Sequence, residues 1–140
     1  MRQRYNECLL ASVCAIHGQD YITASDLFRD LHGRSWHCGQ SSFSQELHGE
    51  FLRYISNGID YLKLCCSTTD ACADYPDLHG SGIVCIRKDD NRHAMAFADG
   101  IVYDPATDET LEFGVMMSRF YPDWSVDTVI RQAHLPTPNH

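Results

Sequence analysis

The chain has 140 residues, about the length of one ordinary domain, and its 44% apolar and 21% charged residues are typical of a globular protein with a buried core. Eleven basic and nineteen acidic residues give a net charge of −8 and an isoelectric point near 5.3, which argue against a nucleic-acid partner held by phosphate contacts. No apolar run approaches the roughly eighteen residues of a membrane span, and polar residues interrupt the arginine-led start, so we expect a soluble, cytoplasmic protein without a signal peptide.

Three helices are predicted in the first half of the chain. The first follows Asn6, a good N-cap residue, and carries an apolar stripe at helical spacing up to Gly18, a natural C-cap. Two further segments begin with spacings that resemble capping boxes, at Thr23 and at Ser42. The expected helices cover residues 7–17, 23–32 and 42–56.

The apolar period changes to that of strands in the second half of the chain. The expected strands cover residues 61–65, 82–87, 92–98, 101–104 and 126–130. Residues 67–80 have the composition of a loop, 111–121 suggest a short helix ended by Pro122, and the tail over 134–140 is expected to fray. Helices followed by strands predict one α+β domain over 1–140, with N-terminal helices packed on a small antiparallel sheet.

A β-hairpin is the sharpest local signal. Asp99 and Gly100 lie between two β-prone runs and favour a two-residue turn, in which residues whose numbers sum to 199 form pairs. Side chains alternate along a strand, so His93 and Asp104 fall on one face as diagonal neighbours, within reach of each other. An acid that orients a histidine is half of a catalytic triad. Alternatively, His93 ends a strand by chance and Asp104 caps the turn made with Pro105.

Cys8 is the favoured nucleophile among seven cysteines. It lies in the first turn of the first predicted helix, where the dipole and free backbone amides stabilise a thiolate. Cys38 is the rival, since His37 and a flexible loop could also give a reactive thiol. Cys14 and Cys85 fall in apolar runs and are interpreted as small core residues. An odd number of cysteines makes a disulfide framework improbable.

The remaining histidines, cysteines and aromatic residues carry weaker signals. A zinc site can be imagined from four residues, but no C-x-x-C pair supports it, and no metal or other cofactor is expected. These residues are Cys65, Cys66, Cys72 and His79. The histidines at 17, 32 and 48 are expected to be solvated. Trp36, Tyr121 and Trp124 are interpreted as core aromatics rather than as the lining of a cleft.

The segments QRYNECLLASVCAIHG at 3–18 and HAMAFADGIVYDP at 93–105 resemble the papain-like cysteine peptidases. The resemblance is closest to the compact bacterial double-glycine, or bacteriocin-leader, peptidases and their stand-alone relatives. It implies that Cys8 is the nucleophile, His93 the general base and acid, Asp104 the orienting acid, and Gln3 the side-chain donor of the oxyanion hole. Four residues separate Gln3 from Cys8 where the family usually has five, so either the loop is tighter or another group donates.

Three functions remain open from the sequence. The first is a thiol hydrolase that cuts a peptide or isopeptide bond of a peptide or protein substrate through an acyl-enzyme. The second is an acyl or glutamyl transferase, or an amidase, with the same triad. The third is a catalytically silent papain-like module that binds a peptide or protein. The negative net charge weakly favours basic partners.

Overall fold

A computed structural model of the chain describes residues 2, 4, 7–36, 42–61 and 77–131, without the side chains of 42–45. The helices are α1 (Cys8–His17), α2 (Tyr21–His32), α3 (Ser42–Ile55) and α5 (Phe113–Phe120). The strands are β1 (Ser81–Lys88), β2 (Asn91–Ala98), β3 (Ile101–Asp104), β4 (Glu109–Glu112) and β5 (Ser125–Arg131). The fold is therefore α+β, as the sequence predicts.

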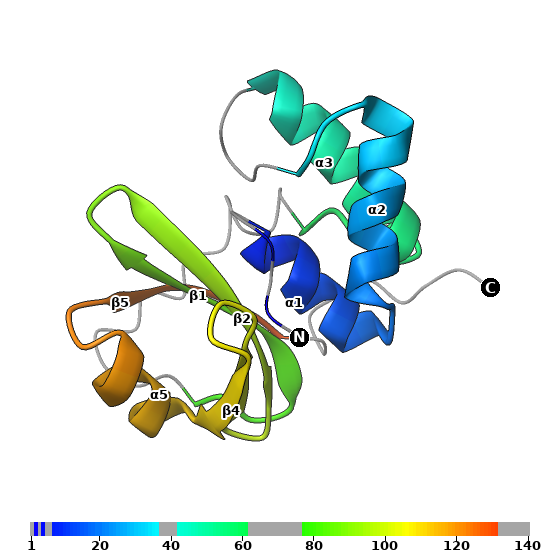
Figure 1. The fold of residues 1–140 in the computed structure, drawn as a ribbon. Coiled ribbons are helices and arrows are strands. Elements are labelled where there is room, and N and C mark those ends of the chain that lie inside the picture. The colour runs from blue at the N-terminus through cyan, green and yellow to red at the C-terminus, as the bar shows by residue number, and fades with distance from the viewer. Residues whose placement is uncertain (1, 3, 5–6, 37–41, 62–76, 132–140) are drawn as a thin grey trace.

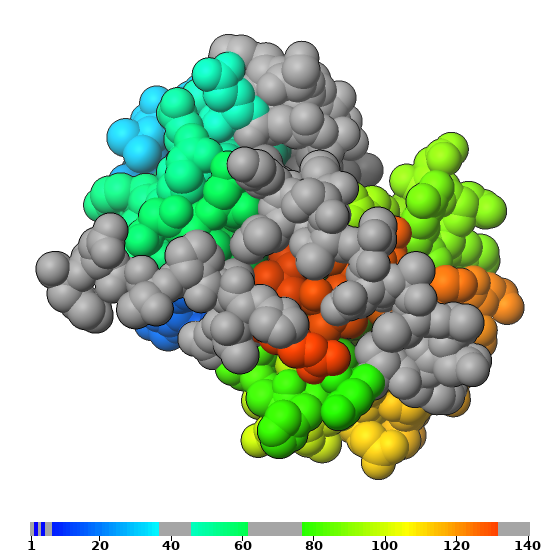
Figure 2. Space-filling model, turned by 180° about the vertical axis from the view of Figure 1, so that it is seen from behind, coloured from blue at the N-terminus to red at the C-terminus, as the bar shows by residue number. Residues whose placement is uncertain are grey.

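The five strands form one antiparallel sheet in the order β4-β3-β2-β1-β5. The chain builds it by consecutive hairpins, after which β5 returns to pair with β1. Helix α1 lies on one face of the sheet, with α2 and α3 outside it, and α5 lies on the other face (Figure 1). In the view from behind, β5 reaches the surface between the helices and the rest of the sheet (Figure 2).

The sheet separates two apolar cores, because successive side chains of β1 and β2 point to opposite faces. The helix-side core includes Leu10, Val13, Phe28, Trp36, Leu52, Ile83 and Cys85. The α5-side core includes Val84, Met95, Phe97, Val102, Phe113 and Met116. Strands β1 and β2 therefore contribute side chains to both cores.

Two helix starts differ from the sequence-based expectation. Helix α1 begins one residue later than expected, with Glu7 at the N-cap position. Helix α2 begins at Tyr21 because the Asp20 side chain accepts a hydrogen bond from the Thr23 backbone N–H at 3.0 Å. The capping box expected at Thr23 is therefore wrong, since an aspartate three residues earlier caps the helix.

The ambiguous segment 111–121 contains two elements, the end of β4 and the whole of α5. The strand expected over 61–65 and the frayed tail lie outside the described residues, apart from Tyr61. This residue is helical, so the strand prediction is wrong there, and it is buried in the helix-side core. Among the described residues, no helix combines the length and apolar character needed to cross a bilayer.

Candidate active site

The hairpin of β2 and β3 sets the register of the site. Asp99 and Gly100 adopt φ values of 48° and 83°, which a type I′ turn requires at both central residues. Ala98 pairs with Ile101, Phe97 with Val102 and Ala96 with Tyr103, so every pair sums to 199, as predicted. This register places the side chains of His93 and Asp104 on the same face of the sheet.

His93 and Asp104 form a buried, hydrogen-bonded pair. Nε2 of His93 lies 2.6 Å from Oδ1 of Asp104, and the two residues are 8% and 0% exposed. The backbone N–H of Ala106 also donates to Oδ1, and the hydroxyls of Thr107 and Tyr121 donate to Oδ2. Burial opposes ionisation of Asp104, but the hydrogen bond from His93 and the other donors outweigh it and hold the carboxyl pKa below its usual value.

Cys8 reaches this pair from the other layer of the molecule. It is the first residue of α1, is half-buried, and its side chain hydrogen-bonds His93. Helix α1 packs against β2, where the Ser12 hydroxyl donates to the backbone carbonyl of Ala94 at 3.2 Å. The docking of α1 on β2 thus brings the thiol to the imidazole, and the helix N-terminus favours negative charge there.

The imidazole of His93 is held between an acid and a thiol. Burial alone lowers its pKa, but the hydrogen bonds and charges of Asp104 and Cys8 outweigh burial and raise the pKa to about 9. Since Nε2 is held by Asp104, Nδ1 is the ring nitrogen left to face Cys8. The arrangement lets His93 hold a proton near neutral pH beside a potential nucleophile.

Tyr121 contacts the cluster of Cys8, His93 and Asp104, a contact that the sequence does not reveal. Its hydroxyl donates to Oδ2 of Asp104 at 2.5 Å, and its ring stacks on His93 with centroids 5.3 Å apart. Tyr121 reaches Asp104 only because α5 folds back across the sheet. In the sequence, Tyr121 is simply an aromatic residue after a short predicted helix. Tyr121 was expected to be a core aromatic, and it does pack against the α5-side core.

A second feature missed from the sequence is the buried carboxylate of Glu7, directly before the thiol. Glu7 is 1% exposed and accepts hydrogen bonds from the Tyr21 hydroxyl and, at 2.8 Å, from the Ser25 hydroxyl. The guanidinium of Arg4 donates to Ser25 at 2.9 Å and pairs with Asp26. These bonds connect the start of α1 to α2 and so fix the position of Cys8.

Several other candidate residues lie outside the described part of the chain. They are Gln3, His37, Cys38, Cys65, Cys66 and Cys72. His79, the fourth residue of the imagined zinc set, is an exposed residue 4.0 Å from Asp99. Among the described residues, no group of three His, Cys, Asp or Glu side chains is placed to hold a metal ion.

The other described cysteines and histidines lie away from this cluster. Cys14 and Cys85 are 0% and 5% exposed in the helix-side core, and burial raises the pKa of the Cys14 thiol to about 12. His17 contacts the Tyr61 hydroxyl at 2.6 Å, and burial lowers its pKa. The expectation that His48 is solvated is wrong: it is 2% exposed and stacks on Trp36, because α3 turns that face inward.

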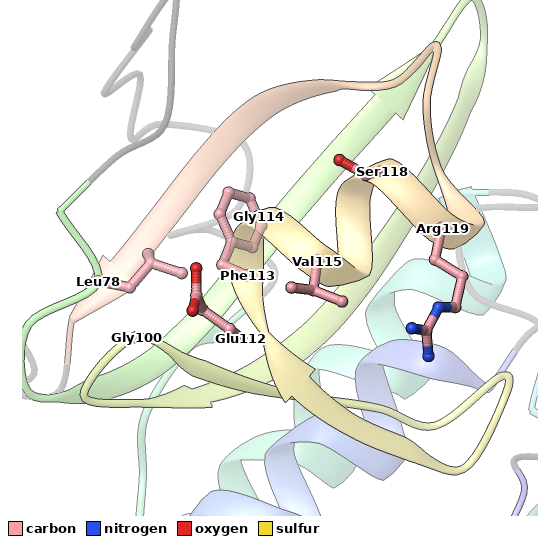
Figure 3. Close-up of a pocket in the computed structure, with 8 residues that line it drawn as sticks. All are labelled: Leu78, Gly100, Glu112, Phe113, Gly114, Val115, Ser118 and Arg119. Atoms are coloured by element: carbon pink, nitrogen blue, oxygen red, sulfur yellow. The ribbon is translucent and has the colours of Figure 1, made fainter.

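An open hollow of about 830 Å³ lies elsewhere, along the outer side of α5. Its lining comes from α5, the end of β4, the β2–β3 turn and Leu78 (Figure 3). The first residue of α5, Phe113, bonds Gly100 of that turn through its backbone N–H, whereas Tyr121 follows the last residue of α5. The hollow runs along α5, and none of Cys8, His93, Asp104 and Tyr121 belongs to its lining.

No family model, curated protein or solved structure matches the chain. The papain-like relationship therefore stays a prediction. The contacts of Cys8, His93 and Asp104 themselves are what point to a function.

Proposed function

We propose that the protein is a papain-like thiol hydrolase that cleaves a peptide or isopeptide bond with Cys8, His93 and Asp104. The observation that carries the proposal is the continuous series of hydrogen bonds from the Cys8 thiol, through the imidazole, to a fully buried carboxylate. A nucleophile, a base and an orienting acid in this order form the arrangement that activates a weak nucleophile for covalent catalysis.

The reaction proceeds in two halves. His93 takes the proton from the Cys8 thiol, and the thiolate attacks the carbonyl carbon of the scissile bond. The tetrahedral intermediate collapses when His93 gives that proton to the leaving amine, which departs and leaves a thioester on Cys8. His93 then removes a proton from water, which attacks the thioester. The second tetrahedral intermediate collapses by breaking its C–S bond, which releases the acid, and the Cys8 sulfur regains its proton from His93. Asp104 stays ionised and holds the imidazole throughout.

The oxyanion of each tetrahedral intermediate needs hydrogen-bond donors. The backbone N–H of Cys8 belongs to the first turn of α1, whose N–H groups have no acceptor within the helix, and it is the donor that we propose. The second donor in this proposal is Gln3, which the papain-like resemblance assigns. Basic peptide segments are the favoured substrates, given the net charge of −8.

The first test is selective alkylation of the native protein. Limiting iodoacetamide at pH 6 is expected to label Cys8 before the other six cysteines, as mapped by mass spectrometry of the digested protein. At this pH an ordinary thiol, with a pKa of about 8.5, is under about 1% thiolate, whereas one paired with an imidazolium is largely ionised. His93→Ala should abolish the selectivity.

His17→Ala is the matched control, because it removes a half-buried imidazole at the end of α1 opposite the thiol. It should leave the labelling of Cys8 unchanged. Labelling of Cys38 first would make our nucleophile wrong. If no cysteine stands out, a peptide-binding module without catalysis replaces the hydrolase.

A second measurement separates hydrolase from transferase. Cys8 is acylated with p-nitrophenyl acetate, and the loss of the acetyl group is followed by intact mass with and without added glycinamide. A hydrolase releases acetate at a rate that the amine does not change. Faster release with formation of acetylglycinamide indicates acyl transfer instead.

A further inference from the structure

Tyr121 joins α5 to the cluster described above. It caps the C-terminus of α5, where its backbone N–H donates to the carbonyl of Met117 at 3.0 Å. Its ring is inclined by 29° to the ring of His93, and it forms a T-shaped contact with the ring of Trp124, with centroids 5.5 Å apart. Its hydroxyl points to Asp104, so one side chain contacts both the imidazole and the acid.

We propose that Tyr121 is a positioning residue of this site, which holds the Asp104 carboxylate in the orientation that keeps Oδ1 on Nε2 of His93. The inference rests on the proposed function and adds to its triad a residue that orients the acid. Tyr121 acts through Asp104 and takes no part in bond making or breaking.

Four described groups donate hydrogen bonds to the buried carboxylate of Asp104. Asp104 is 0% exposed, so water is not available to replace a lost partner. Oδ1 has His93 and the backbone of Ala106, and Oδ2 has the two hydroxyls of Thr107 and Tyr121. Loss of one hydroxyl leaves a buried anionic oxygen under-satisfied, which favours either protonation or rotation of the carboxylate.

Either response weakens the negative charge that faces His93. The imidazole of His93 then binds its proton less tightly, and it is held less firmly in the orientation in which it faces the Cys8 thiol. A tyrosine that only fills space in the α5-side core would behave differently, since its loss would lower stability without changing the proton on His93. The hydroxyl alone distinguishes the two roles, because phenylalanine keeps the stacked ring.

The test uses Tyr121→Phe and iodoacetamide as the probe, so that no substrate is needed. The rate of Cys8 alkylation at pH 5.5 is expected to fall about five- to tenfold. A hydrogen bond to a buried charge is worth a factor of about ten or more, and only part of that loss should reach the thiol. At pH 9.5, where free thiolate dominates, the rate should stay within about twofold of the parent. In parallel, ¹⁵N NMR of the ring should show His93 losing its proton at lower pH.

Tyr103→Phe is the matched control. It also removes one tyrosine hydroxyl from an aspartate, Asp108, at 3.0 Å, but that pair is exposed. Its labelling should equal that of the parent protein at both pH values. Thr107→Val removes the other donor to Oδ2 and should reproduce the loss at pH 5.5, which keeps the proposal testable if Tyr121→Phe fails to fold.

Parent-like labelling and an unchanged His93 titration in folded Tyr121→Phe would overturn the proposal. Equal losses at pH 5.5 and pH 9.5 would also overturn it, because they indicate general disturbance of α1. Failure of the proposed function has a different signature, the absence of selective Cys8 labelling in the parent protein. The NMR comparison still decides the role of Tyr121 in that case.

Discussion

His93 makes the stability of the protein depend on pH, because its pKa differs between the folded and unfolded chain. The folded value of about 9 lies above the unfolded value of about 6.5, so the folded state holds the proton more tightly. The resulting stabilisation is fully present below about pH 6.5 and is lost as the pH rises through about 9. The free energy of unfolding should therefore fall over this alkaline range.

The prediction is a difference between the parent protein and His93→Gln. The parent should be more stable than the variant at pH 6, and this margin should shrink by about 1–3 kcal/mol at pH 9.5. Urea titrations followed by circular dichroism, with a reductant present for the cysteines, measure the margin at each pH. A margin that stays constant or grows with pH contradicts the raised pKa of His93.

At the scale of elements, one glycine in the sheet has no room for a side chain, whereas one glycine in α5 does. A Cβ atom at Gly82 of β1 would lie 2.0 Å from the backbone carbonyl oxygen of Ile130 in β5. At Gly114, in the first turn of α5, the nearest heavy atom to such a Cβ lies 3.6 Å away, which is an ordinary contact. The same substitution should therefore have opposite effects on stability.

Gly82→Ala should destabilise the protein by at least about 2 kcal/mol, because backbone must move where β1 and β5 pair. Gly114→Ala should stabilise it by about 0.5–1 kcal/mol, since alanine restricts the unfolded chain and favours the helix. Urea unfolding of both variants beside the parent provides the measurement. A neutral Gly82→Ala would mean that β5 is not held at this distance from β1.

The elements also show which parts of the site a sequence can predict. The Asp99–Gly100 turn fixes the register of its own hairpin, so the closeness of His93 and Asp104 follows from local chemistry and strand alternation. The position of Cys8 at a helix start is equally local. These features depend on residues near one another in sequence.

The remaining features depend on contacts between distant elements. Tyr121 meets Asp104 only because α5 folds back across the sheet, and Glu7 is buried only because α2 supplies Tyr21 and Ser25. A glutamate before an apolar run looks like a solvated residue until its partners are known. Propensity and periodicity describe one element at a time, so they do not contain these pairings.

At the scale of the whole molecule, the site is assembled from two layers. Cys8 belongs to α1 in the helical layer, whereas His93 and Asp104 belong to the sheet. The thiol and the imidazole therefore meet only while α1 stays docked on β2. Because β1 and β2 contribute side chains to both cores, we expect the helical layer and the sheet to unfold together.

The two tryptophans test this cooperativity, since each reports on a different core. Trp36 is fully buried in the helix-side core, and the half-buried Trp124 packs against the α5-side core. Trp124→Phe leaves Trp36 as the single fluorescent tryptophan, and Trp36→Phe leaves Trp124. Within each variant, the fluorescence and circular dichroism transitions in urea should coincide. Strands β1 and β2 belong to both cores, so neither core can unfold while the other stays folded. A Trp36 transition at lower urea than the circular dichroism transition would contradict this prediction, and it would mean that Cys8 separates from His93 before the sheet unfolds.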